Sequence, residues 1–464
     1  MKDSVWKKYN DDDINMLNII CDDYRKFISN NKIEREVVKT TVEYLESFGF
    51  INLEELKKNE RPLYPGDRIY VNNKGKALAM FIIGEKDITK GINILGAHID
   101  SPRLDLKANP LYEEDEFAYF DTHYYGGIKK YQWLTLPLSL HGVVVKKNGD
   151  SIPICIGEDG SDPVVGITDL LPHLGKEQLE KEASKFIEGE KLDVLIGSMP
   201  QESNEEEKDL VKKNILEILK NKYGIEEDDF LSAEIEVVPA GRARDFGLDR
   251  SMIIGYGQDD KVCSYSSLRA FLDAGICKKT SCCLLVDKEE IGSMGSSGMQ
   301  SSFFENALTE ICSLLGYNEI TALGRVLSNS NMLSSDVNAA YDPLYSEVSD
   351  KRNSSYFNRG VVFCKYTGSR GKSGSNDANA EYVAKIRNIM DQNNVSFQIS
   401  ELGKVDAGGG GTIAYILANK NVNVIDCGVG VLSMHAPWEV TAKADIYESY
   451  KCYISFLKDA LKKN

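Results

Sequence analysis

Short apolar runs alternate with amphipathic segments in the second half of the chain, from about residue 245 onward. The runs have the length and composition of fully buried strands, whereas the segments between them have the periodicity of helices. The runs are MIIGYG, SCCLLVD, GVVFCKY and NVNVIDCG, and the segments are DKVCSYSSLRAFLDAG, NDANAEYVAKIRNIM and GTIAYILANK. Strands that alternate with helices predict a mostly parallel sheet covered on both faces, so an α/β fold is expected.

The first half of the chain begins with helices and a strand of the same kind. Residues 1–50 are predicted to be helical, with Val38, Val42 and Leu45 on one helix face and Gly49 as a stop signal. The run INILGAHID, at 92–100, then has the character of a buried strand that ends on a histidine and an aspartate. These elements belong with the second half of the chain in one α/β domain.

The middle of the chain is different. The stretch LTLPLSLHGVVVKKNGDSIPICIG is rich in strand-forming residues, and its Asn148-Gly149 pair is typical of a hairpin turn. Acidic and mostly helical material is expected over about 175–230, and a loop over 329–355. We therefore predict an α/β domain made of residues 1–106 and 244–464, interrupted by a β-rich domain at 107–243.

Composition excludes several kinds of partner. The formal net charge of −16 would repel phosphate backbones, so nucleic acid is not expected to bind. No segment approaches the ~20 apolar residues of a membrane span, and the opening MKDSVWKKYNDDD lacks the apolar core of a secretory signal. The ten cysteines show no Cys-x-x-Cys spacing. A cytoplasmic protein with reduced, buried cysteines is therefore expected.

Residues that can bind a metal ion stand at the ends of the expected elements. Taken singly, each has an ordinary explanation: a strand-end histidine can be structural, Asp259 can cap a helix, and Asp336 can shape a turn. Histidine and carboxylate side chains are nevertheless the ligands that divalent metals take. The five candidate ligands are His98, Asp259, Glu290, Asp336 and His435.

The paired glutamates Glu289 and Glu290 close to the end of a buried run are the least ordinary of these features. Ionised carboxylates are costly to remove from water. A metal ion would remove that cost for one glutamate and leave the other free to act as a base. Asp100 follows His98 by two residues, on the same side of an extended strand, and can accept a hydrogen bond from its imidazole.

The set as a whole matches a two-metal hydrolase. Such a site needs one bridging carboxylate, one histidine and one carboxylate for each metal, and a separate base near the bound water, with the metals ~3.5–4 Å apart. In chain order the sequence supplies His-x-Asp, Asp-Asp, Glu-Glu, Ser-x-Asp and Met-His, which is five ligands and one base. Metal-assisted hydrolysis is therefore the expected chemistry.

Over nearly its whole length the chain resembles the aspartyl aminopeptidase family, metallopeptidase family eighteen, in its bacterial form. The similar motifs are AHIDSPRLDLK, FGLDRSMIIGYGQDDKVCSYSSLRAF, DKEEIGSMGSSG, SSDVNAAYDPLY, VLSMHAPWEV and, in the family's inserted domain, LLPHL. The chain departs from the family at Gln258-Asp259-Asp260, where Leu-Asp-Asn is usual, and in VDAGGGGTIA, at 405–414. The resemblance implies a zinc-peptidase catalytic domain interrupted by a β-rich dimerisation domain.

The resemblance also implies roles for single residues. The implied metal ligands are His98 and Asp336 for one ion, Glu290 and His435 for the other, and Asp259 as the bridge. Glu289 would be the general base and acid, and Asp100 would orient His98. In the family the dimers assemble into a tetrahedral dodecamer, so a homo-oligomer is expected, with His173 stabilising the substrate in a neighbouring subunit. Zinc is the expected metal, although carboxylate-rich sites also accept manganese or cobalt.

The expected activity is that of a metallo-aminopeptidase that removes the N-terminal residue of small peptides. The preferred residue is left open between acidic and neutral, because Arg370 or Lys372 in GSRGKSG can pair with an acidic side chain or form an ordinary solvated loop. One alternative is a related two-metal amidohydrolase or carboxypeptidase. Another is a non-catalytic assembly protein that kept the fold, which would be expected to have lost a ligand or the base.

Overall fold

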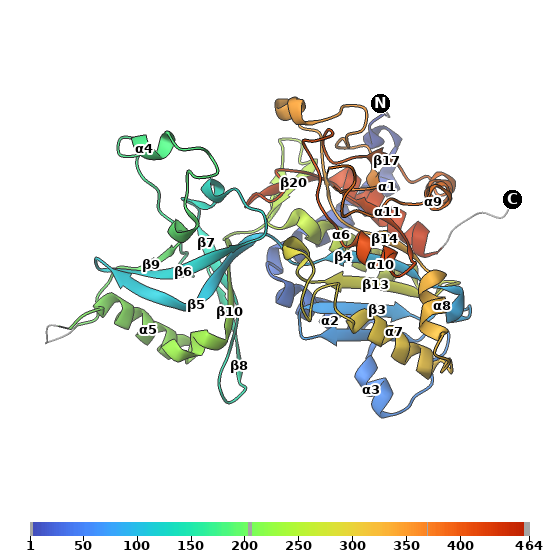
Figure 1. The fold of residues 1–464 in the computed structure, drawn as a ribbon, viewed down its shortest axis with the longest axis horizontal. Coiled ribbons are helices and arrows are strands. Elements are labelled where there is room, and N and C mark those ends of the chain that lie inside the picture. The colour runs from blue at the N-terminus through green and yellow to red at the C-terminus, as the bar shows by residue number, and fades with distance from the viewer. Residues whose placement is uncertain (1–2, 203–206, 369, 459–464) are drawn as a thin grey trace. The chain divides into compact units, whose positions relative to one another are not determined.

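The computed structural model describes residues 3–202, 207–368 and 370–458, and these fold into two compact units (Figure 1). The main unit contains Met1–Asp100, Ala243–Met434 and Glu439–Asn464. The inserted unit contains Ser101–Arg242, together with the short segment His435–Trp438. The predicted domain boundaries, 106/107 and 243/244, lie close to these divisions, but the sequence did not indicate that His435–Trp438 joins the insertion.

A nine-stranded mixed sheet forms the centre of the main unit. In spatial order its strands are β1 (Ile51–Asn52), β2 (Arg68–Asn73), β3 (Ala77–Ile82), β13 (Ser281–Val286), β4 (Asn93–His98), β14 (Asn331–Ser334), β18 (Asn423–Gly428), β16 (Val361–Cys364) and β17 (Phe397–Ser400). The four central strands β13, β4, β14 and β18 run parallel, so their carboxyl ends lie along one edge of the sheet. The expected α/β fold is confirmed.

Helices cover both faces of this sheet, which explains why its central strands are continuously apolar. One face packs against α1 (Asp11–Asn30), α2 (Glu34–Ser47), α6 (Gln258–Ala274), α9 (Ala380–Gln392) and α11 (Lys443–Leu457). The other packs against α3 (Leu53–Lys58), α7 (Phe303–Leu314), α8 (Ala322–Ser328) and α10 (Ala414–Ala418). On β13, Cys283 joins the first layer and Cys282 the second, as expected from the alternation of side chains along a strand.

A second, five-stranded sheet in the main unit leads into two of these helices. Its strands, in order, are β11 (Arg244–Phe246), β12 (Met252–Gly255), β20 (Glu439–Ala442), β19 (Gly430–Leu432) and β15 (Asn338–Ala339). Helix α6 begins shortly after β12, and α11 begins directly after β20. The sheet therefore determines where the first turns of both helices lie.

The inserted unit is built on a six-stranded antiparallel sheet. Its order is β8 (Ser151–Ile156), β7 (Leu138–Val145), β10 (Ala233–Pro239), β5 (Arg103–Glu114), β6 (Phe117–Tyr125) and β9 (Val194–Gly197), with α4 (Lys176–Leu179) and α5 (Leu210–Tyr223) beside it. The predicted hairpin joins β7 to β8. Its turn is longer than two residues, because Lys146 bonds to Asp150, and Gly149 has a φ of 93° inside it.

Other expectations need correction. The predicted loop over 329–355 contains the central strand β14. The predicted helical stretch over 175–230 contains the strand β9 and short 3-10 turns as well as α4 and α5. Nine cysteines are buried as expected, but Cys155 is exposed, and none of the ten forms a disulfide.

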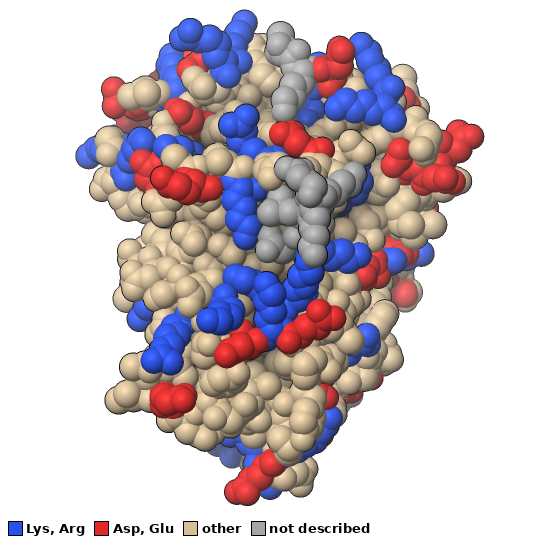
Figure 2. Space-filling view, turned by 90° about the vertical axis from the view of Figure 1, so that its right-hand side faces the viewer, with Lys and Arg blue, Asp and Glu red and all other residues tan. Residues whose placement is uncertain are grey.

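Within the described residues no helix has the length and apolarity needed to cross a bilayer. Despite the acidic net charge, lysine and arginine side chains gather in a band on the face seen in Figure 2.

Candidate metal centre

Four of the predicted site residues meet at the carboxyl edge of the central strands. His98 is the last residue of β4, Glu290 follows β13, and Asp336 follows β14. In a parallel sheet, side chains beyond the strand ends share one crevice. Asp259 reaches this crevice from the start of α6. The convergence of the strand-end residues follows from the parallel pairing of β13, β4 and β14.

His98 is 1% exposed, and the two nitrogens of its imidazole have different neighbours. Its Nδ1 lies 3.1 Å from the main-chain oxygen of Asp100 and 3.3 Å from Oδ1 of the same residue. Its Nε2 lies 3.0 Å from Oδ1 of Asp259 and 3.9 Å from Oδ1 of Asp336. Asp100 therefore contacts the Nδ1 side of the ring, and Nε2 faces the carboxylates. The role of Asp100 in orienting a metal ligand stays a prediction.

The start of α6 places two adjacent aspartates beside His98. Gly257 has a φ of 73°, and Asp259 and Asp260 have non-helical backbone angles within the first turn. The ligand atoms of His98, Asp259 and Glu290 lie within 4.8 Å of one another, and so do those of His98, Asp260 and Asp336. Asp260 was not predicted as a candidate ligand. The only signal for it in the sequence is the doublet Asp259-Asp260.

The electrostatics of this cluster favour a bound cation. Burial raises the pKa of both Asp260 and Asp336 well above the ordinary value for aspartate. Burial lowers the pKa of His98, but its hydrogen bonds to Asp100 and Asp259 and the nearby carboxylate charges outweigh this and raise it. Among the described residues, neither oxygen of Asp260 accepts a hydrogen bond of good geometry. A divalent cation would satisfy these oxygens, and one imidazole among carboxylates suits zinc, manganese or cobalt.

Asp100 also positions the paired glutamates. The main-chain N–H of Glu289 donates to Oδ1 of Asp100 at 3.1 Å, and the N–H of Glu290 donates to Oδ2 at 3.2 Å. The two glutamates form a short 3-10 turn, Glu289–Ile291, after Lys288, whose φ is 70°. A single carboxylate, 1% exposed, thus contacts both His98 and the turn with the glutamates. This second role of Asp100 was not predicted.

Two predicted residues lie in the inserted unit and belong to neither group of candidate ligands. His435 has a φ of 63°, and its Nδ1 lies 2.9 Å from the main-chain oxygen of Gly127. His173 is exposed in the loop before α4, where it lines a cavity of about 700 Å³ within the inserted unit. Their expected roles, as a metal ligand and as a substrate-stabilising residue, stay predictions.

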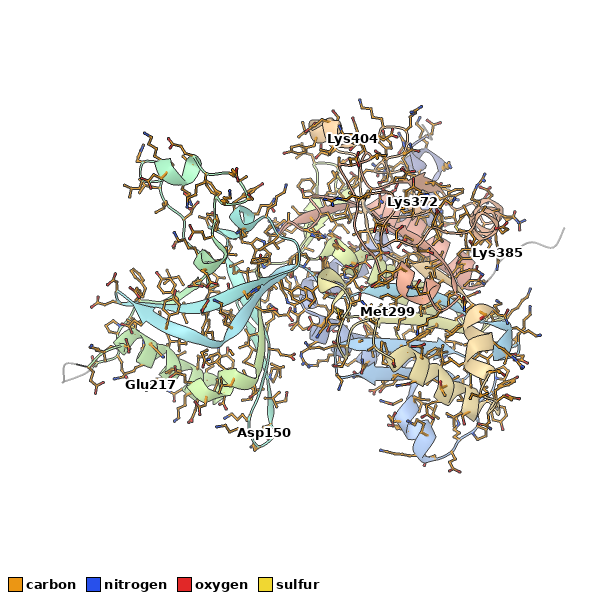
Figure 3. The ribbon with its side chains drawn as sticks, viewed as in Figure 1. Asp150, Glu217, Met299, Lys372, Lys385 and Lys404 are labelled. Carbon is orange, nitrogen blue, oxygen red and sulfur yellow. The ribbon has the colours of Figure 1, made fainter. Side chains whose placement is uncertain are left out.

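The basic loop that was considered for substrate recognition is partly occupied by its own contacts. Lys372, labelled in Figure 3, lies 3.0 Å from Oδ2 of Asp377, and its Nζ lies 3.7 Å from the ring centroid of Tyr366. Arg370 is exposed. Of the two candidates, Lys372 is therefore less available to a substrate carboxylate.

Comparison with known proteins identifies the family. The family described as Aminopeptidase I zinc metalloprotease (M18) matches residues 27–457. A probable M18 family aminopeptidase 1 from Clostridium acetobutylicum is 56% identical to the chain and aligns over 98% of both proteins. The chain belongs to the M18 family. The family assignment made from sequence motifs is therefore confirmed, and so is the expectation of a metallo-aminopeptidase.

Solved structures of M18 proteins have the same fold. The crystal structure of an M18 aminopeptidase from Thermotoga maritima has a TM-score of 0.94 at 44% identity and covers 99% of this chain and 100% of that one. Aminopeptidase I from C. acetobutylicum has a TM-score of 0.90 at 53% identity, covering 98% and 99%. The yeast mApe1 dodecamer shares the fold at 21% identity, with a TM-score of 0.77 and coverage of 96% and 97%.

Proposed function

We propose that this M18 aminopeptidase binds two divalent metal ions, most favourably zinc, at the carboxyl edge of the main sheet. His98 and Asp336 would hold one ion, Glu290 and His435 the other, and Asp259 would bridge them. The observation that supports this best is the convergence of His98, Asp259, Glu290 and Asp336 around one buried imidazole. When bound, such ions acidify water and polarise a carbonyl group.

His435 would complete this set of ligands by binding the metal through Nε2. Histidines that bind metals usually donate their other N–H to a carbonyl or carboxylate oxygen. The Nδ1 of His435 lies 2.9 Å from the oxygen of Gly127. Donation from Nδ1 leaves Nε2 as the nitrogen with a lone pair, which is the form that a metal needs.

Glu289 is proposed to move the protons of the reaction. It would accept a proton from the attacking water and deliver one to the leaving amine, which conserves protons over the peptide cleavage. Its charge contributes to the raised pKa of both His98 and Asp336, which supports this role. Asp100 holds its main chain, so the base would be positioned by the same residue that orients His98. His173 of a neighbouring subunit would stabilise the oxyanion.

The substrates are proposed to be small peptides with a free N-terminus. An acidic N-terminal residue would need an available cation, and the contacts of Lys372 with Asp377 and Tyr366 leave Arg370 as the better candidate in that loop. Aminoacyl substrates with aspartate, glutamate, leucine and alanine at the N-terminus would separate an acidic from a neutral preference. Arg370→Ala should weaken only the acidic substrates if that loop recognises them.

The assembly is proposed to be a homo-oligomer, with the inserted unit as the dimerisation domain. The basis is the yeast relative, whose structure is that of a dodecamer, and the family resemblance of the insertion. Light scattering coupled to size exclusion measures this directly. A monomeric mass in the active preparation would refute it.

The experiment that tests the function compares the wild type with Glu289→Gln after metal reconstitution. We expect the variant to lose about 10²–10⁴-fold in kcat, because a general base and acid is removed. The metal content should stay the same. Glu319→Gln changes an exposed glutamate outside the site and serves as the matched control.

N-terminally acetylated peptides provide a second test of the proposed function. An aminopeptidase must recognise the free amine and should not cleave them. If the reconstituted wild type cleaves only the acetylated peptides, the related amidohydrolase alternative replaces this proposal. Full activity of Glu289→Gln would refute the role of Glu289.

A further inference from the structure

The segment that contains Glu289 has exposed apolar side chains at its tip. Within the turn-rich loop 288–298, Ile291 is 50% exposed and Met294 is 68% exposed. Gly292 and Gly295 both have positive φ angles, of 95° and 97°. The tip of such a loop is not fixed through hydrophobic packing, so hydrogen bonds within the loop and to the sheet contribute to the position of Glu289.

Two carboxylates of the main unit tether this loop at its two ends. Asp100 binds the main chain at the glutamates, as described above. At the far end, the hydroxyl of Ser297 donates to Oδ2 of Asp287 at 2.6 Å. Asp287 directly follows β13, and it also forms a bridge with Gly298. The loop therefore leaves the sheet at Asp287 and returns to the same residue.

The Ser297 contact is buried and closely packed. Asp287 is 1% exposed and Ser297 is 2% exposed. A Cβ atom at Gly298 would come within 2.3 Å of the main-chain oxygen of Ser293, so the loop closes without room for a larger residue. An ionised carboxylate is costly to bury. Asp287 is retained at this place although burial, with the charges of Glu34 and Asp100, raises its pKa to about 6.

We propose that the hydrogen bond from Ser297 to Asp287 is a latch that positions Glu289 for proton transfer. This inference rests on the proposed role of Glu289 as the base. Ser297 and Asp287 are positioning residues, because they act through the loop and not on the substrate. Loss of the latch should leave substrate binding and metal binding in place and reduce the rate of the chemical step.

Ser297→Ala tests the latch, and its neighbour provides the control. Ser296 is exposed, and Nδ2 of Asn73 donates to its main-chain oxygen at 2.8 Å. We expect Ser297→Ala to lower kcat on the order of 10- to 100-fold, the range expected when a catalytic group is displaced by up to about 1 Å. KM and metal content should change less than about twofold. Ser296→Ala should behave as the wild type, and Ser297→Thr, which keeps the hydroxyl, should restore most of kcat.

Hydrogen exchange of loop 288–298 in the metal-free protein gives a readout that does not depend on activity. It should be faster in Ser297→Ala than in Ser296→Ala. If Ser297→Ala does not fold, Ser297→Cys replaces it, because a thiol keeps the volume and donates only weakly.

Glu289→Gln, measured in parallel, separates failure of the latch from failure of the proposed function. If Glu289→Gln is inactive while the Ser297 and Ser296 variants have equal kcat and equal exchange, the latch is refuted. If Glu289→Gln retains full activity, the base assignment on which the latch rests is refuted.

Discussion

Two buried histidines, one in each unit, stand on β-strands beside carboxylates, but the sheets around them are built differently. His98 ends β4 in the main unit and is 1% exposed. His141 lies within β7 of the inserted unit and is 2% exposed. The Nε2 of His98 lies 3.0 Å from Asp259, and the Nε2 of His141 lies 3.3 Å from Oε1 of Glu158. Residue type, burial and a carboxylate partner therefore do not by themselves define the site.

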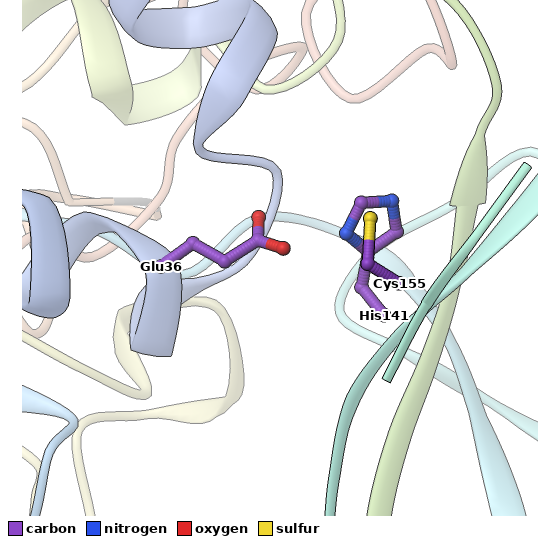
Figure 4. A group of neighbouring side chains, drawn as sticks. All are labelled: Glu36, His141 and Cys155. Carbon is purple, nitrogen blue, oxygen red and sulfur yellow. The ribbon is translucent and has the colours of Figure 1, made fainter. Parts of the chain in front are cut away.

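The difference lies in the sheet around each histidine. β4 runs parallel to its neighbours, so its end faces the ends of β13 and β14 and several carboxylates meet there. β7 is antiparallel to its neighbours, and His141 in mid-strand faces Glu236 and Cys155 across the ladder. Figure 4 shows Cys155 beside His141. The Nε2 of His141 contacts Glu158 and the Ser139 hydroxyl, at 3.2 Å from the latter, and both belong to the inserted unit.

The largest expected effect is a contrast in metal binding between His98→Ala and His141→Ala. Removal of a direct ligand from a centre of carboxylates should weaken metal binding by more than about 100-fold, above the range for residues that only support ligands. His141→Ala should change the metal affinity by less than about twofold. Metal titration of the chelated proteins measures both. Equal losses in the two variants would show that the parallel strand ends do not determine where the metal binds.

A carboxylate with only main-chain partners shows what burial does without a cation. Asp445 on α11 accepts the N–H groups of Asn358 and Gly360, both at 2.8 Å, and burial still raises its pKa from 3.8 to about 7. The folded state holds this proton more tightly than the unfolded state. Its contribution to stability is therefore fully present below about pH 4 and is lost as the pH rises to about 7, by about 4 kcal/mol.

Asp445→Asn should remove this part of the pH dependence. Denaturant unfolding of metal-free protein between pH 4 and pH 8 should show a smaller decrease in the free energy of unfolding for the variant than for the wild type. The metal-free form is needed because metal binding also changes with pH. Parallel curves for the two proteins would contradict the raised pKa.

Much of the fold could be predicted from the sequence, because its central strands are continuous apolar runs. β13 and β4 were recognised in this way. β14 was missed, since only Met332 and Leu333 are apolar in it and asparagine and serine flank them. Its burial comes from its position between β4 and β18, and tertiary packing, not the local sequence, sets that position. The antiparallel direction of β3 and β16 within the main sheet also had no signal in the sequence.

The candidate site was predicted in part. Residue types at strand ends, together with the family motifs, predicted His98, Asp259, Glu290 and Asp336 as ligands, and the fold brings these four together. The supporting contacts were not predictable in the same way. Asp100 binds the main chain of Glu289 across 189 positions in the sequence, and a main-chain donor has no residue signature. The latch serine, Ser297, looked like part of an ordinary Gly/Ser loop.

Asp100→Asn should have the next largest effect and would sharpen the difference between the two histidines. Asp100 links His98 to the turn of Glu289, whereas Glu158 contacts His141 and Ser139, which both lie on β7. We expect metal affinity to fall about 10- to 100-fold, the usual cost of losing a residue that supports a metal ligand. The kcat at saturating metal should also fall. A loss of metal affinity with unchanged kcat would remove Asp100 from the positioning of Glu289.

The smallest expected effect is on the stability of the inserted unit. His141→Ala leaves the buried hydroxyl of Ser139 and the carboxylate of Glu158 with one partner fewer, which should cost about 1–2 kcal/mol in the free energy of unfolding. His141→Gln, which keeps a polar group at this position, should lose less. Metal content and kcat should stay at the wild-type level in both variants, because His141 is a structural residue in an antiparallel strand. A fall in metal content at unchanged stability would instead mean that His141 contributes to the metal centre.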